Sequence, residues 1–312
     1  MAAQSRSSVY ASAPFKFIVE GEPLYIHSDL VSLHSKPLDR MIHAPMAEAQ
    51  KGFATLEDVD EGTFVRFIEW AHKGYYTAAE FTTDEARSSR TSGNQNHDEV
   101  VPTTQEADFP GETIRLASEE NFDFAPVIEA EPEPEPMSWD APLASSYKKG
   151  KKVKKVIHFD RLDQKGGLKE SFISRRYTVR QSAVEIPPPR PNHHPEEDYT
   201  DVFLSHVQLY VFADAYDIQP LRVLALEELH ATLAIHTLYP ERTGDIIALL
   251  RYVYANTRKL REGVEDVRNL VTQYVGYEMG MLIRDPAFGD LIIKDGGDLL
   301  GDILRMVGQR TS

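Results

Sequence analysis

The chain of 312 residues contains no cysteine. Disulfide bonds, zinc sites built on thiolates and cysteine nucleophiles are therefore excluded, and the composition fits a reducing compartment. The first residues, MAAQSRSSVYASAP, lack the apolar run of a signal peptide. No window approaches the roughly 20 apolar residues that a membrane helix needs. We therefore expect a soluble protein of the cytoplasm, the nucleus or both, without a membrane partner.

Sequence patterns typical of enzymes are also missing. The chain has no GxGxxG after a strand, no GxxxxGKS or GxxxxGKT, no HExxH and no GxSxG. The DGGD sequence at 295–298 lacks the ligand alternation and terminal Glu of an EF-hand loop. His193 and His194 stand without other nearby ligands and are interpreted as loop residues. We expect no enzymatic activity, no cofactor and no bound metal; an enzyme or small-molecule site in the helical region stays open as an alternative.

Apolar residues make up 41% of the chain, a low share for a fully folded protein, and the formal net charge is −15. Part of the chain is therefore expected to lie outside a core. A negative average charge disfavours nucleic-acid binding because phosphate contacts need a positive face. The chain also contains no recognisable DNA-reading domain, so we expect no sequence-specific nucleic-acid partner.

Short strands and helices are predicted between residues 15 and 76. The β-prone runs at 15–19 and 24–26 flank a Gly-containing turn and predict a β-hairpin. Ser28 is predicted to cap the helix that follows, and Ser35 is predicted to cap a second helix directly after it. Two short helices joined almost without a loop must pack at a steep angle.

A strand and a longer helix complete this stretch. The strand is predicted at 53–56, and Asp60 is the predicted cap of the helix after it. Phe64 and Phe67 belong to the apolar face of this helix, and Gly74 is predicted to end it.

Together these residues resemble a BTB/POZ domain, in particular those of fungal proteins. The shared pattern is a β-hairpin, His27 at the first helix, Ser35 at the second, a strand ending in Leu56-x-Asp58, and a Phe-rich helix. The resemblance resumes further along, where YVFADAYDIQPLRVLALEEL is similar to the last helical hairpin of the family. It implies an α+β fold, in which a small mixed sheet is capped by helical hairpins, and a role in protein–protein interaction.

The resemblance also suggests a partner. BTB adaptors that bind cullin-3 often carry a hydrophobic-x-Glu triplet in the loop before the lone strand, and Met46-Ala47-Glu48 stands there. An exposed apolar side chain would fill a groove of the partner while the carboxylate meets a basic rim. In the alternative interpretation, Met46 packs locally and Glu48 is solvated.

A second feature departs from the family. Dimerising BTB domains of transcription factors often pair an Asp just before the first strand with a basic residue right after the His. Pro14 and Ser28 stand at these places here. The charged pocket of those proteins is therefore missing, which disfavours a corepressor-binding groove and that style of dimer.

The periodic pattern is lost from about residue 81 to residue 200. Polar residues and the Pro/Glu repeat EAEPEPEPMSWDAP favour extended, solvated backbone, so we expect a largely disordered, charged and Pro-rich insertion. The basic cluster in this insertion has three interpretations. It is a nuclear import signal, a contact with nucleic acid or an acidic membrane, or a solvated segment whose charge balances the preceding acidic run. The lysines of this cluster are Lys148, Lys149, Lys151, Lys152, Lys154 and Lys155.

Helical spacing returns at Asp201 and continues nearly to the end of the chain. The insertion therefore interrupts the BTB-like domain, whose two parts are expected to fold together. The expected regions are a disordered N-terminus at 1–13, the first BTB part at 14–80, the insertion at 81–200, the closing helices at 201–235 and a C-terminal helical extension at 236–312.

Two functions follow from the resemblance. The leading hypothesis is a protein-interaction module that serves as a substrate adaptor of a cullin-3 ubiquitin ligase, with cullin-3 and a recruited substrate as its partners. The alternative is a nuclear regulatory or scaffold protein that uses BTB self-association and the basic cluster.

Overall fold

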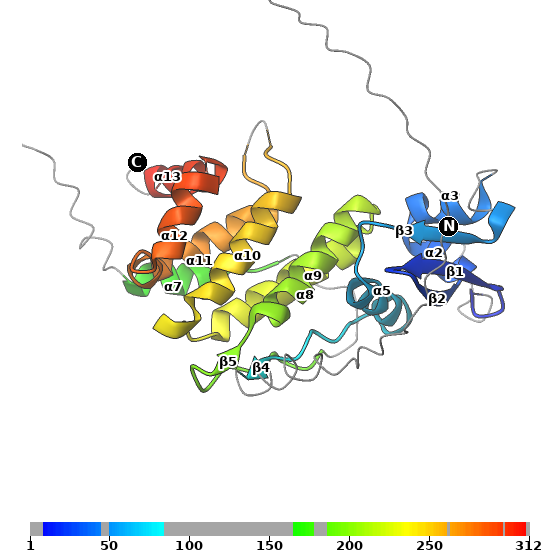
Figure 1. Ribbon diagram of the computed structural model, residues 1–312, viewed down its shortest axis with the longest axis horizontal. Helices are drawn as coiled ribbons and strands as arrows, with labels where there is room; N and C mark the ends of the chain where they lie inside the picture. The colour runs from blue at the N-terminus through cyan, green and yellow to red at the C-terminus, as the bar shows by residue number, and fades with distance from the viewer. Residues whose placement is uncertain are drawn as a thin grey trace, which may run out of the picture. The chain divides into compact units, whose positions relative to one another are not determined.

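The structure is a computed structural model that describes residues 9–44, 50–83, 165–177, 186–260, 263–295 and 297–309. All of these belong to one compact unit, formed by residues 1–95 and 159–312. Residues 96–158 form a second unit, which lies outside the described part of the chain. The described elements, drawn in Figure 1, combine two small sheets with many helices. The chain is therefore of mixed α and β class and mostly helical.

A three-stranded sheet forms the N-terminal part. β1 (Pro14–Val19) pairs antiparallel with β2 (Glu22–His27) and parallel with β3 (Phe53–Leu56), so the strand order is β2-β1-β3. Gly21 adopts a φ of 89° in the turn between β1 and β2, a conformation that favours glycine. Phe17, at the centre of β1, is fully buried. The predicted hairpin and lone strand are confirmed, with β1 one residue longer and β2 three residues longer than expected.

Two short helices connect the hairpin to β3. They are α2 (Ser28–His34) and α3 (Lys36–His43), and the Ser35 hydroxyl accepts a backbone N–H from the first turn of α3 at 3.1 Å, as predicted. The predicted cap at Ser28 is wrong, because Ser28 is already the first residue of α2. His27 precedes it and makes no side-chain cap. The Ser28 N–H instead donates to the backbone just ahead of β1 at 3.2 Å.

The longer helix, α5 (Glu61–Lys73), has the boundaries that the sequence predicts. The Asp60 carboxylate caps its N-terminus, and Gly74 ends it with a φ of 81°. Phe64 and Phe67 on its apolar face are fully buried. This face is the surface onto which the later helices pack.

The helical hairpin α8 (Thr200–Ala215) and α9 (Gln219–Ile235) returns to the N-terminal part. α8 packs against α5, where Phe212 lies 5.1 and 6.1 Å, between ring centroids, from two phenylalanines of α5. The Ser35 hydroxyl donates to the Tyr216 carbonyl at 2.8 Å. The cap of α3 therefore also binds the end of α8, and the parts of the chain before residue 84 and after residue 199 share one core.

Three short elements lie within the interval 81–200, where the sequence predicts no periodic structure. They are β4 (Thr82–Thr83), α7 (Lys165–Ile173) and β5 (Glu197–Asp198), and β4 pairs antiparallel with β5. Each is too short, or too rich in glycine, to produce a recognisable period. The ordered part of the chain therefore reaches further into this interval than the pattern of side chains indicates.

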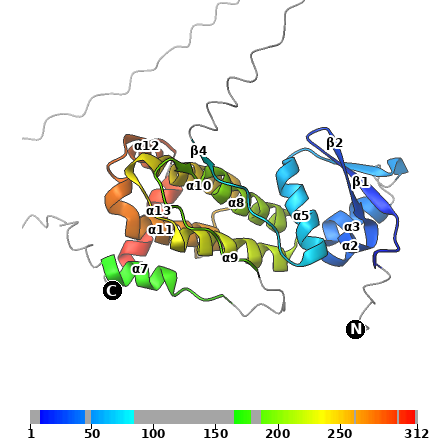
Figure 2. The same cartoon turned by 90° about the horizontal axis from the view of Figure 1, so that it is seen from below.

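The C-terminal helices form layers around α8 and α9. α10 packs on α8, and α11 packs on α9, α10, α7 and α13, an arrangement that Figure 2 shows from a second side. The last predicted helix, around residues 288–307, is divided by a π-helical turn. The elements are η2 (Pro240–Arg242), α10 (Thr243–Asn256), α11 (Asp266–Leu282), α12 (Pro286–Asp290), η3 (Leu291–Asp295) and α13 (Gly297–Gln309).

Candidate functional site

The two residues predicted to contact cullin-3, Met46 and Glu48, lie outside the described residues, in the connection between α3 and β3. The structure does describe the borders of this connection. α3 ends at His43, and Gly52 turns the chain into β3 with a φ of 76°. β3 is an edge strand that pairs only with β1 among the strands described. The structure therefore leaves the predicted contact at Met46 and Glu48 a prediction.

A serine, an aspartate and a histidine meet on the outer side of α2 and α3. The Ser32 hydroxyl donates to Asp39 Oδ1 at 2.5 Å, and His43 Nδ1 lies 2.8 Å from the same oxygen. The hydrogen bond from Ser32 is the main cause that lowers the pKa of Asp39. In a catalytic triad the histidine stands between the serine and the acid. Here one nitrogen of His43, Nδ1, faces both Asp39 Oδ1 and, at 3.5 Å, the Ser32 hydroxyl, while that hydroxyl donates to the acid. His43 therefore does not join the other two residues through its two ring nitrogens, and the cluster ties α2 to α3.

The two positions at which the family pattern expects charges lie together at the open end of the hairpin. Pro14 stands opposite His27 in the β1–β2 register, and Ser28 follows His27. His27 Nδ1 lies 2.8 Å from the Ser12 carbonyl. Pro14 and Ser28 carry no charge, so the charged pair of the family pattern is missing at these two positions.

A cavity of about 540 Å³ lies between α8, α9 and two segments that flank the interval 84–185. One segment is residues 75–81, and the other, which we call the return segment, is residues 186–199. The walls are mostly aromatic and Pro-rich, with polar groups at the floor. Residues that line it include Tyr75, Tyr76, Phe81, Pro189, Tyr199 and His206.

The floor of this cavity is formed by three side chains that are linked by buried hydrogen bonds. His206 Nδ1 lies 2.7 Å from the Tyr76 hydroxyl, and His206 Nε2 lies 3.3 Å from the Thr232 hydroxyl. Burial lowers the pKa of His206 to about 3, so its imidazole is neutral near pH 7. Both ring nitrogens already have partners within the protein. The floor can therefore orient a bound group, but it presents no free base or acid.

Buried polar contacts fix the return segment to the start of α10. Arg242 donates to two backbone carbonyls of the segment at 2.6 and 3.0 Å. The Asn192 amide makes two hydrogen bonds with the backbone of Thr237, at 2.7 and 2.8 Å. Asp245 accepts the Tyr199 N–H at 2.9 Å, and burial raises the pKa of Asp245 to about 6. These directional contacts hold the segment in one position.

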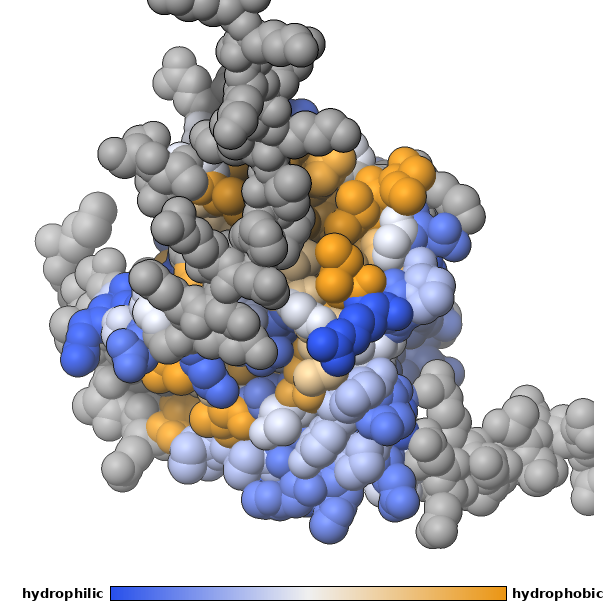
Figure 3. All heavy atoms as spheres, turned by 90° about the vertical axis from the view of Figure 1, so that its left-hand side faces the viewer, coloured by the Kyte–Doolittle hydropathy of each residue, from blue (hydrophilic) through white to orange (hydrophobic). Residues whose placement is uncertain are grey.

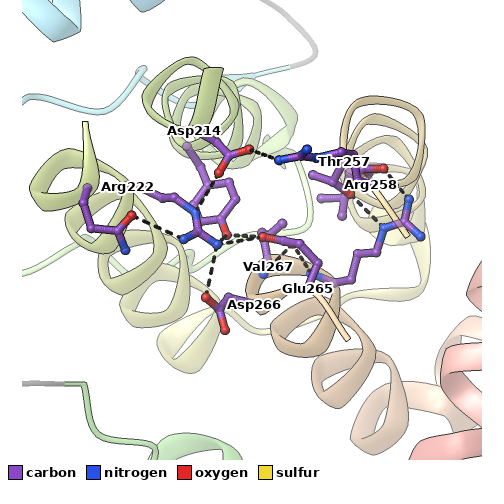
Figure 4. Close-up of polar contacts among 11 residues, drawn as sticks. Asp214, Arg222, Thr257, Arg258, Glu265, Asp266 and Val267 are labelled. Atoms are coloured by element: carbon purple, nitrogen blue, oxygen red, sulfur yellow. Dashed lines mark hydrogen bonds and ion pairs between the residues drawn. The ribbon is translucent and has the colours of Figure 1, made fainter. Parts of the chain in front are cut away.

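A second polar cluster joins α8, α9 and α11 beside a cavity of about 470 Å³ (Figure 4). Arg222 donates to the Tyr210 hydroxyl at 2.6 Å, to Glu265 at 3.1 Å and to Asp266 at 3.2 Å. Its Nε also faces Asp214 at 3.4 Å. Burial and the Glu265 carboxylate raise the pKa of Tyr210. Because carboxylates surround the guanidinium, this cluster is a clamp between helices and offers no site for an anion.

The residues considered as metal ligands do not converge on one point, and Asp298 is paired with two basic side chains. Asp298 faces Lys259 at 2.6 Å and Arg268 at 3.3 Å. The His193 N–H donates to Glu197, and His194 is exposed in the return segment. Over the described ranges, no group of three or more His, Cys, Asp or Glu residues could hold a metal ion.

The basic cluster of Lys148, Lys149, Lys151, Lys152, Lys154 and Lys155 lies outside the described residues. The three interpretations of this cluster, as an import signal, a contact with nucleic acid or an acidic membrane, or a solvated segment, therefore stay predictions. No helix in the described part of the chain combines the length and apolar character required to cross a membrane.

Apolar side chains are exposed at the end of the unit that carries α12 and α13. Figure 3 views this end and shows apolar residues between charged ones. Ile293 is the most exposed of them, at 82%. Leu300 and Leu304 lie one helical turn apart on α13, and Ile283 follows α11. Exposed apolar groups of this kind often contact other proteins.

Comparisons with protein-family models, with curated proteins and with solved structures found no match. The functional proposals below therefore depend on the sequence and the geometry of this chain.

Neither the first cavity nor the clamp around Arg222 was predicted from the sequence. Tyr76 and His206 stand far apart in the chain, and only the fold brings them together. One signal was present: aromatic residues gather on both sides of the interval, in YYTAAEF at 75–81 and EEDYTDVF at 196–203. Such paired aromatic clusters indicate where the two ends of an insertion meet.

Proposed function

We propose that the chain is a protein-interaction module of the BTB/POZ type. The observation that carries this proposal is the return of α8 and α9 to the N-terminal sheet and α5, through the contacts of Phe212 and Tyr216. Together with the strand order β2-β1-β3, it matches the arrangement that the resemblance implies, a small mixed sheet capped by helical hairpins. The proposed role is non-catalytic. The arrangement of Ser32, Asp39 and His43 supports this, as do the occupied nitrogens of His206.

We further propose that the module is a substrate adaptor of a cullin-3 ubiquitin ligase. Met46 and Glu48 would supply the contact, at the border formed by α3 and the edge strand β3. An apolar anchor flanked by a carboxylate fits a groove with a basic rim.

Capture of purified cullin-3 by the immobilised full chain tests the adaptor role. Met46→Asp and Glu48→Lys are expected to lower capture at least about tenfold, because a buried anchor or ion pair is lost. Leu260→Asp and Glu241→Lys are matched controls, since both residues are exposed, Leu260 in the loop between α10 and α11 and Glu241 in η2. Equal capture by all five chains, or capture by none, contradicts the adaptor role and leaves the broader interaction module standing.

The nuclear regulator is a second candidate, and the density of lysines between Lys148 and Lys155 favours it. Deletion of this segment is expected to shift a fluorescent fusion from the nucleus to the cytoplasm. An unchanged distribution in imaging contradicts the import signal. A monomeric mass in solution contradicts the self-association that this candidate requires.

The cavity of about 540 Å³ supports a third candidate, the binding of a small apolar molecule against its aromatic walls. Fluorescence of 8-anilinonaphthalene-1-sulfonate would be measured with the wild type and with Ala79→Leu, which fills the cavity. Ala255→Leu, on the exposed side of α10, is the control. Loss of the signal in Ala79→Leu alone supports this site, and equal signals from all three chains contradict it.

A further inference from the structure

α7 is held against the C-terminal helices by one aromatic anchor. Phe172, only 1% exposed, lies between His230 of α9 and the rings of Tyr274 and Tyr277 of α11. The ring-centroid distances to these residues are 4.8, 5.8 and 5.2 Å. His230 Nε2 donates to the Phe172 carbonyl at 2.8 Å. The groove thus recognises both an aromatic side chain and the backbone beside it.

Two further residues of the segment contact the same groove. Leu168, one helical turn before Phe172, is half-buried and packs against the core. Tyr177 places its ring 5.4 Å from that of His230. Glu170 and Ile173 point to solvent. The docking face therefore has the pattern of a short helical peptide that binds through an apolar residue and an aromatic residue four positions later.

The segment depends on the groove for its helical conformation. α7 has nine residues, and its sequence, KGGLKESFI, contains two glycines, which disfavour helix. Isolated helices of fewer than about 12 to 15 residues are marginal in water even without glycine. Two buried polar atoms at the end of the segment, Arg175 Nη1 and Tyr177 Oη, have no hydrogen-bond partner. Docking of the segment therefore carries a desolvation cost, because these two atoms lose their hydrogen bonds to water. Release of the segment removes this cost.

The rim of the groove carries negative charge, whereas the segment is basic. Glu227 and Asp266 act electrostatically on the Tyr177 hydroxyl, and Glu278 acts on Tyr277. The docked segment carries Arg175 and Arg176 three and four positions after its anchor, Phe172. The charge of an occupant that fits this groove is therefore positive on the C-terminal side of the aromatic residue.

We propose that the groove between α9 and α11 is a peptide-docking site, which α7 of the same chain occupies and from which a partner protein displaces it. The partner segment is a short helix with a Leu-x-x-x-Phe pattern followed by basic residues. This site is separate from the α3–β3 border and goes beyond the interaction proposed there. Figures 1 and 2 both show α7 beside α11, on a part of the unit that the N-terminal sheet does not contact.

Fluorescence anisotropy with a labelled peptide of residues 165–177, KGGLKESFISRRY, tests the proposal on the full chain. Phe172→Ala and Leu168→Asp each weaken docking of the internal segment and leave the groove unchanged. Both variants are expected to bind the peptide at least about tenfold more tightly than the wild type, because the internal competitor no longer fills the groove. A peptide with Phe172→Ala is expected to bind none of the chains. Asp266→Asn in the Leu168→Asp background is expected to weaken binding and reduce its salt dependence.

Three outcomes overturn the proposal. The first is no binding to Leu168→Asp, which carries the test if Phe172→Ala does not fold. The second is equal affinity for the wild type and the variants, since α7 would then not compete. The third is a wild-type dimer, seen by light scattering, that Phe172→Ala converts to a monomer. In that case the occupant is α7 of a second copy and not a partner protein.

Discussion

The return segment and α7 both come from the interval in which the sequence predicts no structure, yet they are attached in different ways. The return segment is bound by Arg242, Asn192 and Asp245 through buried or half-buried, directional hydrogen bonds. α7 is bound by the ring of Phe172 and one hydrogen bond to its carbonyl. Buried polar networks require one geometry, whereas an aromatic anchor tolerates exchange. The first attachment therefore belongs to the scaffold, and the second is suited to a replaceable ligand.

The largest expected effect concerns the scaffold attachment. Arg242→Ala is expected to lower the free energy of unfolding by about 3 to 5 kcal/mol, because it removes the cation that faces the buried Asp198 carboxylate and the donor to two backbone carbonyls of the return segment. Urea unfolding followed by circular dichroism measures this change. Arg251→Ala, on the exposed side of α10, is the control and is expected to change stability by less than about 0.5 kcal/mol. Equal stability of both variants would show that the return segment is not fixed by this network.

A smaller effect is expected from acid. The pKa of His206 is about 3 in the folded chain and 6.5 in the unfolded chain, so the unfolded state binds the proton first. The stability that His206 contributes is therefore complete above pH 6.5 and is lost as the pH falls toward 3, by about 3 kcal/mol at pH 4. His206→Gln is expected to flatten the dependence of unfolding free energy on pH between 7 and 4.

The pH dependence that Asp245 gives to the unfolding free energy has the opposite sign. Its pKa is raised to about 6, above the value of 3.8 expected for the unfolded chain, so its contribution to stability is complete below pH 3.8 and is lost as the pH rises through 6. Asp245→Asn is therefore expected to make the loss of stability between pH 7 and 4 steeper than in the wild type. Unfolding curves at four pH values measure both slopes. Identical slopes for the wild type and both variants contradict these assignments.

The smallest expected difference is the one between substitutions of two equally buried phenylalanines. Phe203→Ala in α8 is expected to cost about 3 to 5 kcal/mol of unfolding free energy. Phe172→Ala is expected to cost less than about 2 kcal/mol, because undocking of α7 limits the loss. Urea unfolding of the two variants compares them directly. Equal losses would place α7 in the cooperative core.

Turns, helix caps and helix ends were predictable from the sequence, because a few adjacent residues determine each of them. The hairpin, the caps at Ser35 and Asp60, and the helix end at Gly74 are examples. The cap at Ser28 was wrong because the chain passes from β2 into α2 without a free turn. These features depend on neighbouring residues, so the pattern of side chains contains most of the information.

The candidate sites were less predictable because they depend on residues far apart in the chain. Tyr76 meets His206 at the floor of the first cavity, and Phe172 meets Tyr274 in the groove. No spacing in the sequence indicates these contacts. α7 was missed because its two glycines hide the helical pattern of Leu168 and Phe172. The two residues can be assigned to one helical face only once the groove that receives their side chains is known.

Hydrogen exchange of the wild-type chain, followed by mass spectrometry, tests the difference between the two attachments most directly. The amides of residues 168–173 are expected to exchange at least about 100-fold faster than those of α8, because α7 opens without global unfolding. The Tyr199 amide, which Asp245 binds, is expected to exchange together with α8. Exchange of α7 at the rate of α8 would contradict the account and make α7 a permanent part of the scaffold.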